Sequence, residues 1–217
     1  MQMVKKRLAI FASGRGSNFR AILEQVHKGF IPATVVLCIT NNSNAGVIDI
    51  ARSSRIPVQI IIPKNFPDTA AYNDAILKEL LAAKVDYIIL AGYLKLIGRQ
   101  IIDAYPNRII NIHPALLPSF GGKGMYGHHV HEAVFESGAR VSGVTVHLVN
   151  SEYDAGPIVL QQAVSIDDVQ SPDEIAERVL ALEHKIYSEA VKLLVEDRLR
   201  VQGKRIQITG DDKSGQN

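Results

Sequence analysis

The stretch RLAIFASGRGSNFRAILEQVHKGFIPATVVLCIT, residues 7–40, decides the fold that the sequence predicts. Its apolar, β-branched run at 7–12 predicts a strand, residues 18–28 have the period of a helix, and the run at 34–40 predicts a second strand. Strands that alternate with helices in this way are typical of an α/β domain.

The same alternation continues along the chain. We expect a helix near 45–54, a strand at 58–62, a helix at 69–83 and a strand at 86–91, which is apolar as in sheets covered on both faces. The remaining predicted elements are a short helix near 98–105, a strand at 108–114, a helix ending near 137, strands at 142–149 and 157–164, a long helix opening at Ser171, and a hairpin at 199–208. The predicted fold class is α/β, with a doubly wound, mostly parallel sheet and helices on both faces.

Length and composition indicate one globular domain. The chain has 217 residues, of which 47% are apolar and 21% charged, a balance that allows a buried core. We expect a single domain over 1–209 and a polar, disordered tail over 210–217. The net charge of +2, with scattered Lys and Arg, argues against a nucleic-acid partner. Because no apolar stretch approaches the roughly 20 residues of a membrane helix, we expect no membrane span.

The only cysteine of the sequence, Cys38, lies inside the apolar run at 35–39 and has no partner for an internal disulfide. A small thiol in such a run packs well in a core. We therefore interpret Cys38 as a core residue and expect a reducing compartment, the cytoplasm.

A glycine-rich loop, GRGSN at 14–18, joins the first predicted strand to the first helix. Glycine lets the backbone approach a ligand, and the free N–H groups at a helix start favour an anion. The alternative is an ordinary turn in which Ser17 or Asn18 caps the helix. A dinucleotide site is disfavoured because Phe19 replaces a small residue and TNN at 40–42 contains no acidic residue, and the loop lacks the Lys-Ser/Thr pair of triphosphate sites. We favour a single phosphate monoester.

Asn111 and His113 stand two residues apart at the end of a predicted strand, so both side chains point to one side. Ligands of α/β sheets gather at the carboxyl ends of strands, where this strand ends. Asp154 lies in a polar loop at 150–157 that could fold over the same edge. An amide, an imidazole and a carboxylate together suit acyl transfer to an amine, with donors for an oxyanion and a carrier for a proton. The alternative leaves Asn111 bonded to backbone, His113 satisfied in the core and Asp154 in a turn.

The other histidines carry weaker indications of function. His128, His129 and His131 lie close together, but no cysteine or carboxylate cluster accompanies them at ligand spacing, so we predict no metal site. His147 lies on a predicted strand, where it could support residues that act on a ligand.

Four segments make the chain similar to the folate-dependent formyltransferases, and in particular to the phosphoribosylglycinamide formyltransferases. They are GRGSN at 14–18, LAGYLKLI at 90–97, NIHPALLP at 111–118 and DAGP at 154–157. The resemblance covers about residues 7–195. It implies a Rossmann-like fold, small-molecule partners, and transfer of a formyl group from 10-formyltetrahydrofolate to glycinamide ribonucleotide in purine synthesis.

The resemblance also implies binding roles for the matched residues. The substrate phosphate would be held by Gly16, Ser17 and Asn18, and the ribose hydroxyls by Glu183. The folate pocket would be formed by Tyr93, Leu94, Lys95, Leu96, Ile97, Asn150 and Asp154. Lys95 stands where an arginine is frequent, which replaces a forked donor by a point charge. The loop at 119–127 is longer than in the shortest family members, and it could act as a lid.

Asn111, His113 and Asp154 match the catalytic trio of that family. The resemblance implies that the amine attacks the formyl carbon directly while Asn111 and a protonated His113 hold the oxyanion. Asp154 would keep that imidazole charged and help to pass a proton, through water, to the departing folate nitrogen.

Rival functions remain at this point. Two share the formyl-transfer core: a hydrolase that releases formate from formyltetrahydrofolate, and a transferase that formylates methionyl-tRNA. Both carry an additional domain that we do not expect here. A non-catalytic folate- or nucleotide-binding module of the same fold is the third, and the complete catalytic trio argues against it. The oligomeric state, monomer or homodimer, stays open.

Overall fold

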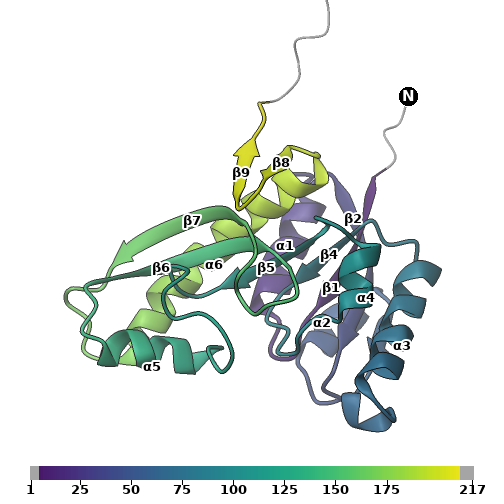
Figure 1. Ribbon diagram of the computed structural model, residues 1–217, viewed down its shortest axis with the longest axis horizontal. Coiled ribbons are helices and arrows are strands. Elements are labelled where there is room, and N and C mark those ends of the chain that lie inside the picture. The colour runs from purple at the N-terminus through teal and green to yellow at the C-terminus, as the bar shows by residue number, and fades with distance from the viewer. Residues whose placement is uncertain (1–4, 211–217) are drawn as a thin grey trace, which may run out of the picture.

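The computed structural model describes residues 5–210, and its centre is a seven-stranded sheet with the order β3-β2-β1-β4-β5-β6-β7 (Figure 1). The strands from β3 to β5 are parallel, whereas β6 and β7 run antiparallel to their neighbours. The strands are β1 (Lys6–Phe11), β2 (Ala33–Thr40), β3 (Val58–Ile60), β4 (Tyr87–Leu90), β5 (Ile109–His113), β6 (Val141–Leu148) and β7 (Ile158–Ser165). The predicted doubly wound, mostly parallel sheet is confirmed.

Helices cover both faces of this sheet, and alternate side chains of β1 enter two different cores. Leu8 and Ile10 pack in a cluster with α1, α2, α5 and α6, whereas Ala9 and Phe11 pack in a second cluster with α3 and α4. The helices are α1 (Ser17–His27), α2 (Val47–Ser53), α3 (Thr69–Ala82), α4 (Arg99–Ala104), α5 (His128–Glu136) and α6 (Pro172–Val195), with a 3-10 turn at Pro63–Asn65. Within residues 5–210, no helix is long and apolar enough to cross a membrane.

Helix α6 begins where the sequence predicts. The Ser171 hydroxyl accepts a hydrogen bond from the Glu174 backbone N–H at 3.4 Å, and Pro172 occupies the first turn. Further along the helix, the buried Tyr187 hydroxyl lies 2.8 Å from the Leu90 carbonyl and 3.2 Å from the Ile110 carbonyl. This hydroxyl ties α6 to β4 and β5.

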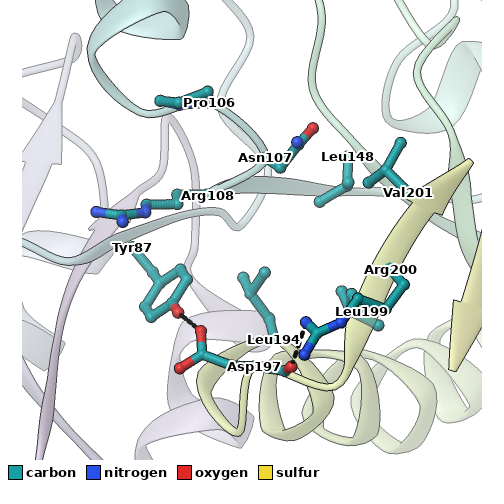
Figure 2. Close-up of a pocket in the computed structure, with 10 residues that line it drawn as sticks. All are labelled: Tyr87, Pro106, Asn107, Arg108, Leu148, Leu194, Asp197, Leu199, Arg200 and Val201. Carbon is teal, nitrogen blue, oxygen red and sulfur yellow. Dashed lines mark hydrogen bonds between the residues drawn. The ribbon is translucent and has the colours of Figure 1, made fainter. Parts of the chain in front are cut away.

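The predicted terminal hairpin is confirmed as β8 (Leu199–Gln202) and β9 (Arg205–Ile208). Together with the end of α6, it closes a small pocket of about 170 Å³ (Figure 2). Tyr87, Arg108 and Asp197 line this pocket at the amino ends of β4 and β5, whereas the predicted catalytic residues lie at the other end of β5. The predicted disordered tail at 210–217 lies outside the described residues, except for its first residue.

Candidate active site

The loop after β6 brings Asp154 to the carboxyl end of β5. Asp154 Oδ2 lies 3.6 Å from His113 Nδ1, and the two side chains are 10% and 3% exposed. Asp154 has a φ of 52°, in the left-handed region, where aspartate is one of the better tolerated residues. The structure therefore places Asp154 close to His113, a contact that sequence spacing alone could not establish.

The loop at 119–127 covers both of these groups. His113 Nε2 donates to the Phe120 carbonyl at 2.7 Å, and the Gly122 backbone N–H donates to Asp154 Oδ2 at 2.9 Å. A protonated His113 would thus have one N–H directed at Phe120 and the other facing Asp154. Binding of an oxyanion at Nε2 therefore requires that the Phe120 carbonyl move away. The sequence carried no signal for this contact, because a backbone carbonyl leaves no residue pattern.

Burial sets the charge of the imidazole. It lowers the pKa of His113, and the opposing effects of the Asp154 charge and the Phe120 carbonyl do not cancel it. The pKa of Asp154 also lies below its ordinary value: burial raises it, but neighbouring groups, among them His113 and the Gly122 N–H, favour the carboxylate more strongly. The free chain at neutral pH therefore combines an ionised Asp154 with a neutral His113, whereas the resemblance implied a standing positive charge on that ring.

Asn111 contacts a histidine of the neighbouring strand. In the antiparallel pairing of β5 with β6, Asn111 lies opposite His147, and Asn111 Nδ2 is 3.2 Å from His147 Nε2. His147 Nε2 is also 3.5 Å from Asp154 Oδ1, and its Nδ1 lies 2.9 Å from the Leu148 carbonyl. Among residues 5–210, the Asn111 side chain bonds to His147 and not to backbone, so His147 joins the predicted trio. The sequence predicted a strand around His147, but it did not predict the β5–β6 register that places His147 beside Asn111.

The glycine-rich loop lies between β1 and α1 and has the backbone that an anion site requires. Gly16 is the N-cap of α1, with a φ of 83°, and no side chain caps the helix. The alternative in which Ser17 or Asn18 is the N-cap is therefore wrong. A Cβ on Gly16 would lie 2.9 Å from Ile50 Cδ1 and 3.2 Å from Val47 Cα, so a side chain has no room there. The uncapped N–H groups of the first turn remain available to a ligand.

Asn18 and Glu183, predicted separately as phosphate and ribose contacts, touch each other. Asn18 Nδ2 donates to Glu183 Oε2 at 2.6 Å. The buried Asn18 Oδ1 has no hydrogen-bond partner among residues 5–210. Burial raises the pKa of Glu183, although the Asn18 amide opposes this shift. A buried acceptor without a donor and a partly desolvated carboxylate are the groups that a hydroxyl-bearing ligand satisfies.

The predicted folate segment divides into buried and exposed side chains. Tyr93 and Ile97 are only 8% and 3% exposed, and the Tyr93 hydroxyl bonds to that of Tyr72. Tyr93 and Ile97 therefore anchor the segment in the core. Leu94 and Leu96 are 47% and 42% exposed and can contact a ligand. Their neighbour Lys95 is exposed as well.

Two contacts fix the backbone around that segment. The Leu94 backbone N–H donates to the Ser13 hydroxyl at 3.0 Å, which joins the segment to the start of the glycine-rich loop. Val149 packs against the cluster that contains Tyr93 and Ile97. The following residue, Asn150, accepts a hydrogen bond from the Glu152 N–H at 3.1 Å and so shapes the loop toward Asp154.

The three histidines at the start of α5 take part in other contacts. His128 lies 3.6 Å from Glu132 and 3.7 Å from Asp173, and His129 Nδ1 lies 3.1 Å from Glu132. His131 is buried, and burial lowers its pKa to about 4. In the described part of the chain, no group of three or more His, Cys, Asp or Glu side chains has the arrangement of a metal site. The absence of a metal stays a prediction.

Comparison with known proteins relates this geometry to a family. The pattern of the family described as "Formyl transferase" matches residues 6–191. Phosphoribosylglycinamide formyltransferase, chloroplastic, of Arabidopsis thaliana is 48% identical over 90% of this chain and 68% of its own length. Phosphoribosylglycinamide formyltransferase of Bacillus subtilis (strain 168) is 40% identical over 88% of this chain and 95% of its own. The crystal structure of glycinamide ribonucleotide transformylase 1 from Symbiobacterium toebii superposes with a TM-score of 0.91 at 36% identity, covering 96% of each chain. The chain belongs to the formyl transferase family.

Proposed function

We propose that this protein transfers the formyl group of 10-formyltetrahydrofolate to the amine of glycinamide ribonucleotide, a step of purine synthesis. The observation that carries the proposal is the cluster at the carboxyl end of β5, in which Asp154 lies 3.6 Å from His113. Asn111 joins this cluster through His147, which lies 3.2 Å from Asn111 and 3.5 Å from Asp154. The names of the Arabidopsis and Bacillus relatives give the same acceptor and the same transferred group.

The acceptor is held at the start of α1. The N–H groups of Gly16, Ser17 and Asn18 bind its phosphate, because the helix start offers unpaired donors and a favourable dipole. Glu183 accepts hydrogen bonds from the ribose hydroxyls, and Asn18 fixes the position of that carboxylate. The buried and partnerless Asn18 Oδ1 then gains a donor from the ligand.

The donor folate lies against the segment at 93–97 and the loop that carries Asn150 and Asp154. The exposed Leu94 and Leu96 contact its apolar faces, Lys95 contributes a point charge, and the buried Tyr93 and Ile97 keep the backbone in place. Formyl-folate is consumed as a co-substrate, and no metal takes part in the proposed reaction.

The transfer itself needs an oxyanion site and a proton carrier. The amine nitrogen forms a bond to the formyl carbon, the bond from that carbon to the folate nitrogen breaks, and one proton passes from the amine to the folate nitrogen. Asn111 donates an N–H to the developing oxyanion. His113 donates from Nε2 once the loop at 119–127 has withdrawn the Phe120 carbonyl. The ring is neutral in the free chain, and the Asp154 charge beside Nδ1 favours uptake of a second proton from water, which gives the imidazolium. Asp154 also helps to pass the amine proton, through water, to the departing folate nitrogen.

The test mixes purified protein with 10-formyltetrahydrofolate, with and without glycinamide ribonucleotide, and follows loss of the formyl group from the folate. We expect deformylation that depends on the ribonucleotide and produces formylated ribonucleotide in equal amount. Formate release without the ribonucleotide would identify a formyltetrahydrofolate hydrolase instead. No reaction under either condition would identify a non-catalytic binding module.

We further propose that the enzyme acts in the cytoplasm, as a monomer or homodimer. The buried free thiol of Cys38 fits a reducing compartment. One relative is named as chloroplastic, so the compartment is to be tested by fractionation of the source cells. Sedimentation of the purified chain measures its oligomeric state.

A further inference from the structure

His147 lies between two of the three proposed catalytic side chains. Its Nε2 is 3.2 Å from Asn111 Nδ2 and 3.5 Å from Asp154 Oδ1. The side chain is 3% exposed, so these protein groups, and not bulk water, form the surroundings of the ring. His147 can therefore fix the orientation of the side chain to which it is hydrogen-bonded.

The contact at the other ring nitrogen decides which bond that is. His147 Nδ1 lies 2.9 Å from the Leu148 carbonyl, and a carbonyl oxygen can only accept, so Nδ1 carries a hydrogen. In the neutral ring, Nε2 is then the acceptor. Asn111 faces this acceptor with Nδ2, the donor end of its amide, at the shorter of the two distances. The tautomer of His147 and the orientation of the Asn111 amide therefore agree.

The amide orientation matters because an asparagine can present either a donor or an acceptor to a ligand. Asn111 Nδ2 has two hydrogens, and His147 Nε2 engages one of them. If the amide turned by 180°, its Oδ1 would meet the lone pair of His147 Nε2, and two acceptors would be in contact. His147 thus disfavours the orientation in which Asn111 would present an oxygen to a developing oxyanion.

We propose that His147 is a positioning residue for formyl transfer: it fixes the Asn111 amide so that the second Nδ2 hydrogen is available to the oxyanion. The proposal rests on the proposed function, in which Asn111 is the oxyanion donor. His147 itself does not touch substrate. Its effect appears in the transition state, where the oxyanion develops, and so in kcat rather than in KM.

Three substitutions separate this role from simple packing. In His147→Gln the side-chain oxygen can reach the place of Nε2 and accept from Asn111. In His147→Asn the shorter amide can reach only the place of Nδ1, near the Leu148 carbonyl. In His147→Leu both polar contacts are lost at similar volume. We expect kcat to fall about 10- to 100-fold for Leu and Asn and to stay within about 3-fold of wild type for Gln, with both KM values little changed.

A double-mutant cycle with Asn111→Ala tests the partner. If His147 acts through Asn111, then His147→Leu lowers kcat in the wild-type chain but has almost no further effect once Asn111 is alanine. Full, multiplicative losses would overturn the proposal, and so would an Asn111→Ala chain with undiminished kcat. A parallel cycle with Asp154→Asn identifies the other neighbour: if only that substitution absorbs the effect of His147→Leu, the ring acts through the carboxylate and the proposal is wrong.

A measurement on the unaltered chain does not depend on whether the variants fold. Long-range ¹H–¹⁵N correlation spectra of the wild-type protein, at the pH of the activity assay, report which ring nitrogen of His147 bears the proton. We expect a protonated Nδ1 and an unprotonated Nε2, and a protonated Nε2 would overturn the proposal. Failure of the proposed function looks different, because wild-type protein would then transfer no formyl group, whereas failure of this inference leaves an active enzyme with additive substitutions.

Discussion

Aspartates lie near both ends of β5, and their surroundings differ in burial. Near the carboxyl end, the Asp154 side chain is 10% exposed and faces the imidazoles of two histidines at 3.5 and 3.6 Å. Near the amino end, the Asp197 side chain is 58% exposed and pairs with Lys6 at 2.9 Å. Both residues have a left-handed backbone, with φ of 52° and 55°. The two aspartates therefore share a backbone conformation but differ in the surroundings of their carboxylates.

This difference indicates which carboxylate has a chemical role. Removing a charge from water is costly unless it is paired, and the rings beside Asp154 carry no fixed charge. Water and a permanent cation compensate the charge of Asp197, which joins β1 to the end of α6 as a surface clamp. A charge kept in a buried place at a strand end is typical of a functional site.

Asp154→Asn has the largest expected effect. Asparagine preserves the size of the side chain and tolerates the left-handed backbone, so the substitution removes mainly the charge. Without it, the proton carrier is lost and the imidazolium at His113 is less stable. We expect kcat to fall about 10³-fold, with KM values and the thermal midpoint close to wild type. Unchanged turnover in steady-state assays would remove Asp154 from the mechanism.

Glu183→Gln tests the acceptor side of the same sheet edge. The substitution retains the size of the side chain but replaces the charged carboxylate, which accepts hydrogen bonds from the ribose hydroxyls, by a neutral amide. We expect the KM for glycinamide ribonucleotide to rise about 10- to 100-fold, because hydrogen bonds to charged groups contribute on the order of 1.5–3 kcal/mol. The KM for formyl-folate serves as the internal control and should not move. Equal increases in both constants would indicate general distortion rather than a ribose contact.

The fold was largely predictable from the sequence, because hydrophobic periodicity reports which faces are buried. The apolar run of β4 and the Ser171 cap of α6 each predicted a local structure that is observed. The antiparallel pairing of β6 with β5 and with β7 was not predicted, since periodicity alone does not specify how strands pair.

The sequence named the residues of the proposed site one by one, but it did not predict the contacts between them. Asn111 and His113 share a strand, so their common side follows from the two-residue period. The approach of Asp154 and His147 depends on strand register and loop path, which link residues distant along the chain. The Phe120 carbonyl that accepts from His113 belongs to the backbone and has no sequence signal at all. The contacts that the sequence did not predict therefore depend on long-range strand pairing, on loop path and on main-chain groups.

Two glycines of one loop allow a matched test of the carboxyl edge. Gly16 has a φ of 83°, and a Cβ there would lie 2.9 Å from Ile50 Cδ1, whereas a Cβ on Gly14 meets no atom within 4 Å. We expect Gly16→Ala to reduce the free energy of unfolding by about 1–3 kcal/mol and to raise the KM for the ribonucleotide. Gly14→Ala should change stability by no more than about 0.5 kcal/mol. A Gly16→Ala loss in urea unfolding as small as that expected for Gly14→Ala would show that the loop does not need a glycine at position 16.

Acid should destabilise the chain partly through the buried His131 of α5. The pKa of His131 is about 4, below the ordinary 6.5, because burial disfavours its charged form. The unfolded chain takes up this proton first, so stability is full above pH 6.5 and declines as the pH falls toward 4. The slope from this one group is at most about 1.4 kcal/mol per pH unit. His131→Gln should flatten the decline of the thermal midpoint between pH 6.5 and 4, and an unchanged slope would assign acid sensitivity to other groups.

Asp197→Asn has the smallest expected effect and completes the comparison with Asp154→Asn. Asparagine tolerates a φ of 55°, and its side-chain oxygen can still accept from the Tyr87 hydroxyl, so the main loss is the attraction to Lys6. A surface pair of this kind contributes about 0.5 kcal/mol, and salt screens it. We therefore expect a small drop in the thermal midpoint that shrinks as salt is raised, and an unchanged kcat. A kcat that fell with Asp197→Asn would mean that the two ends of β5 are coupled, because no charge at the proposed catalytic cluster has been altered.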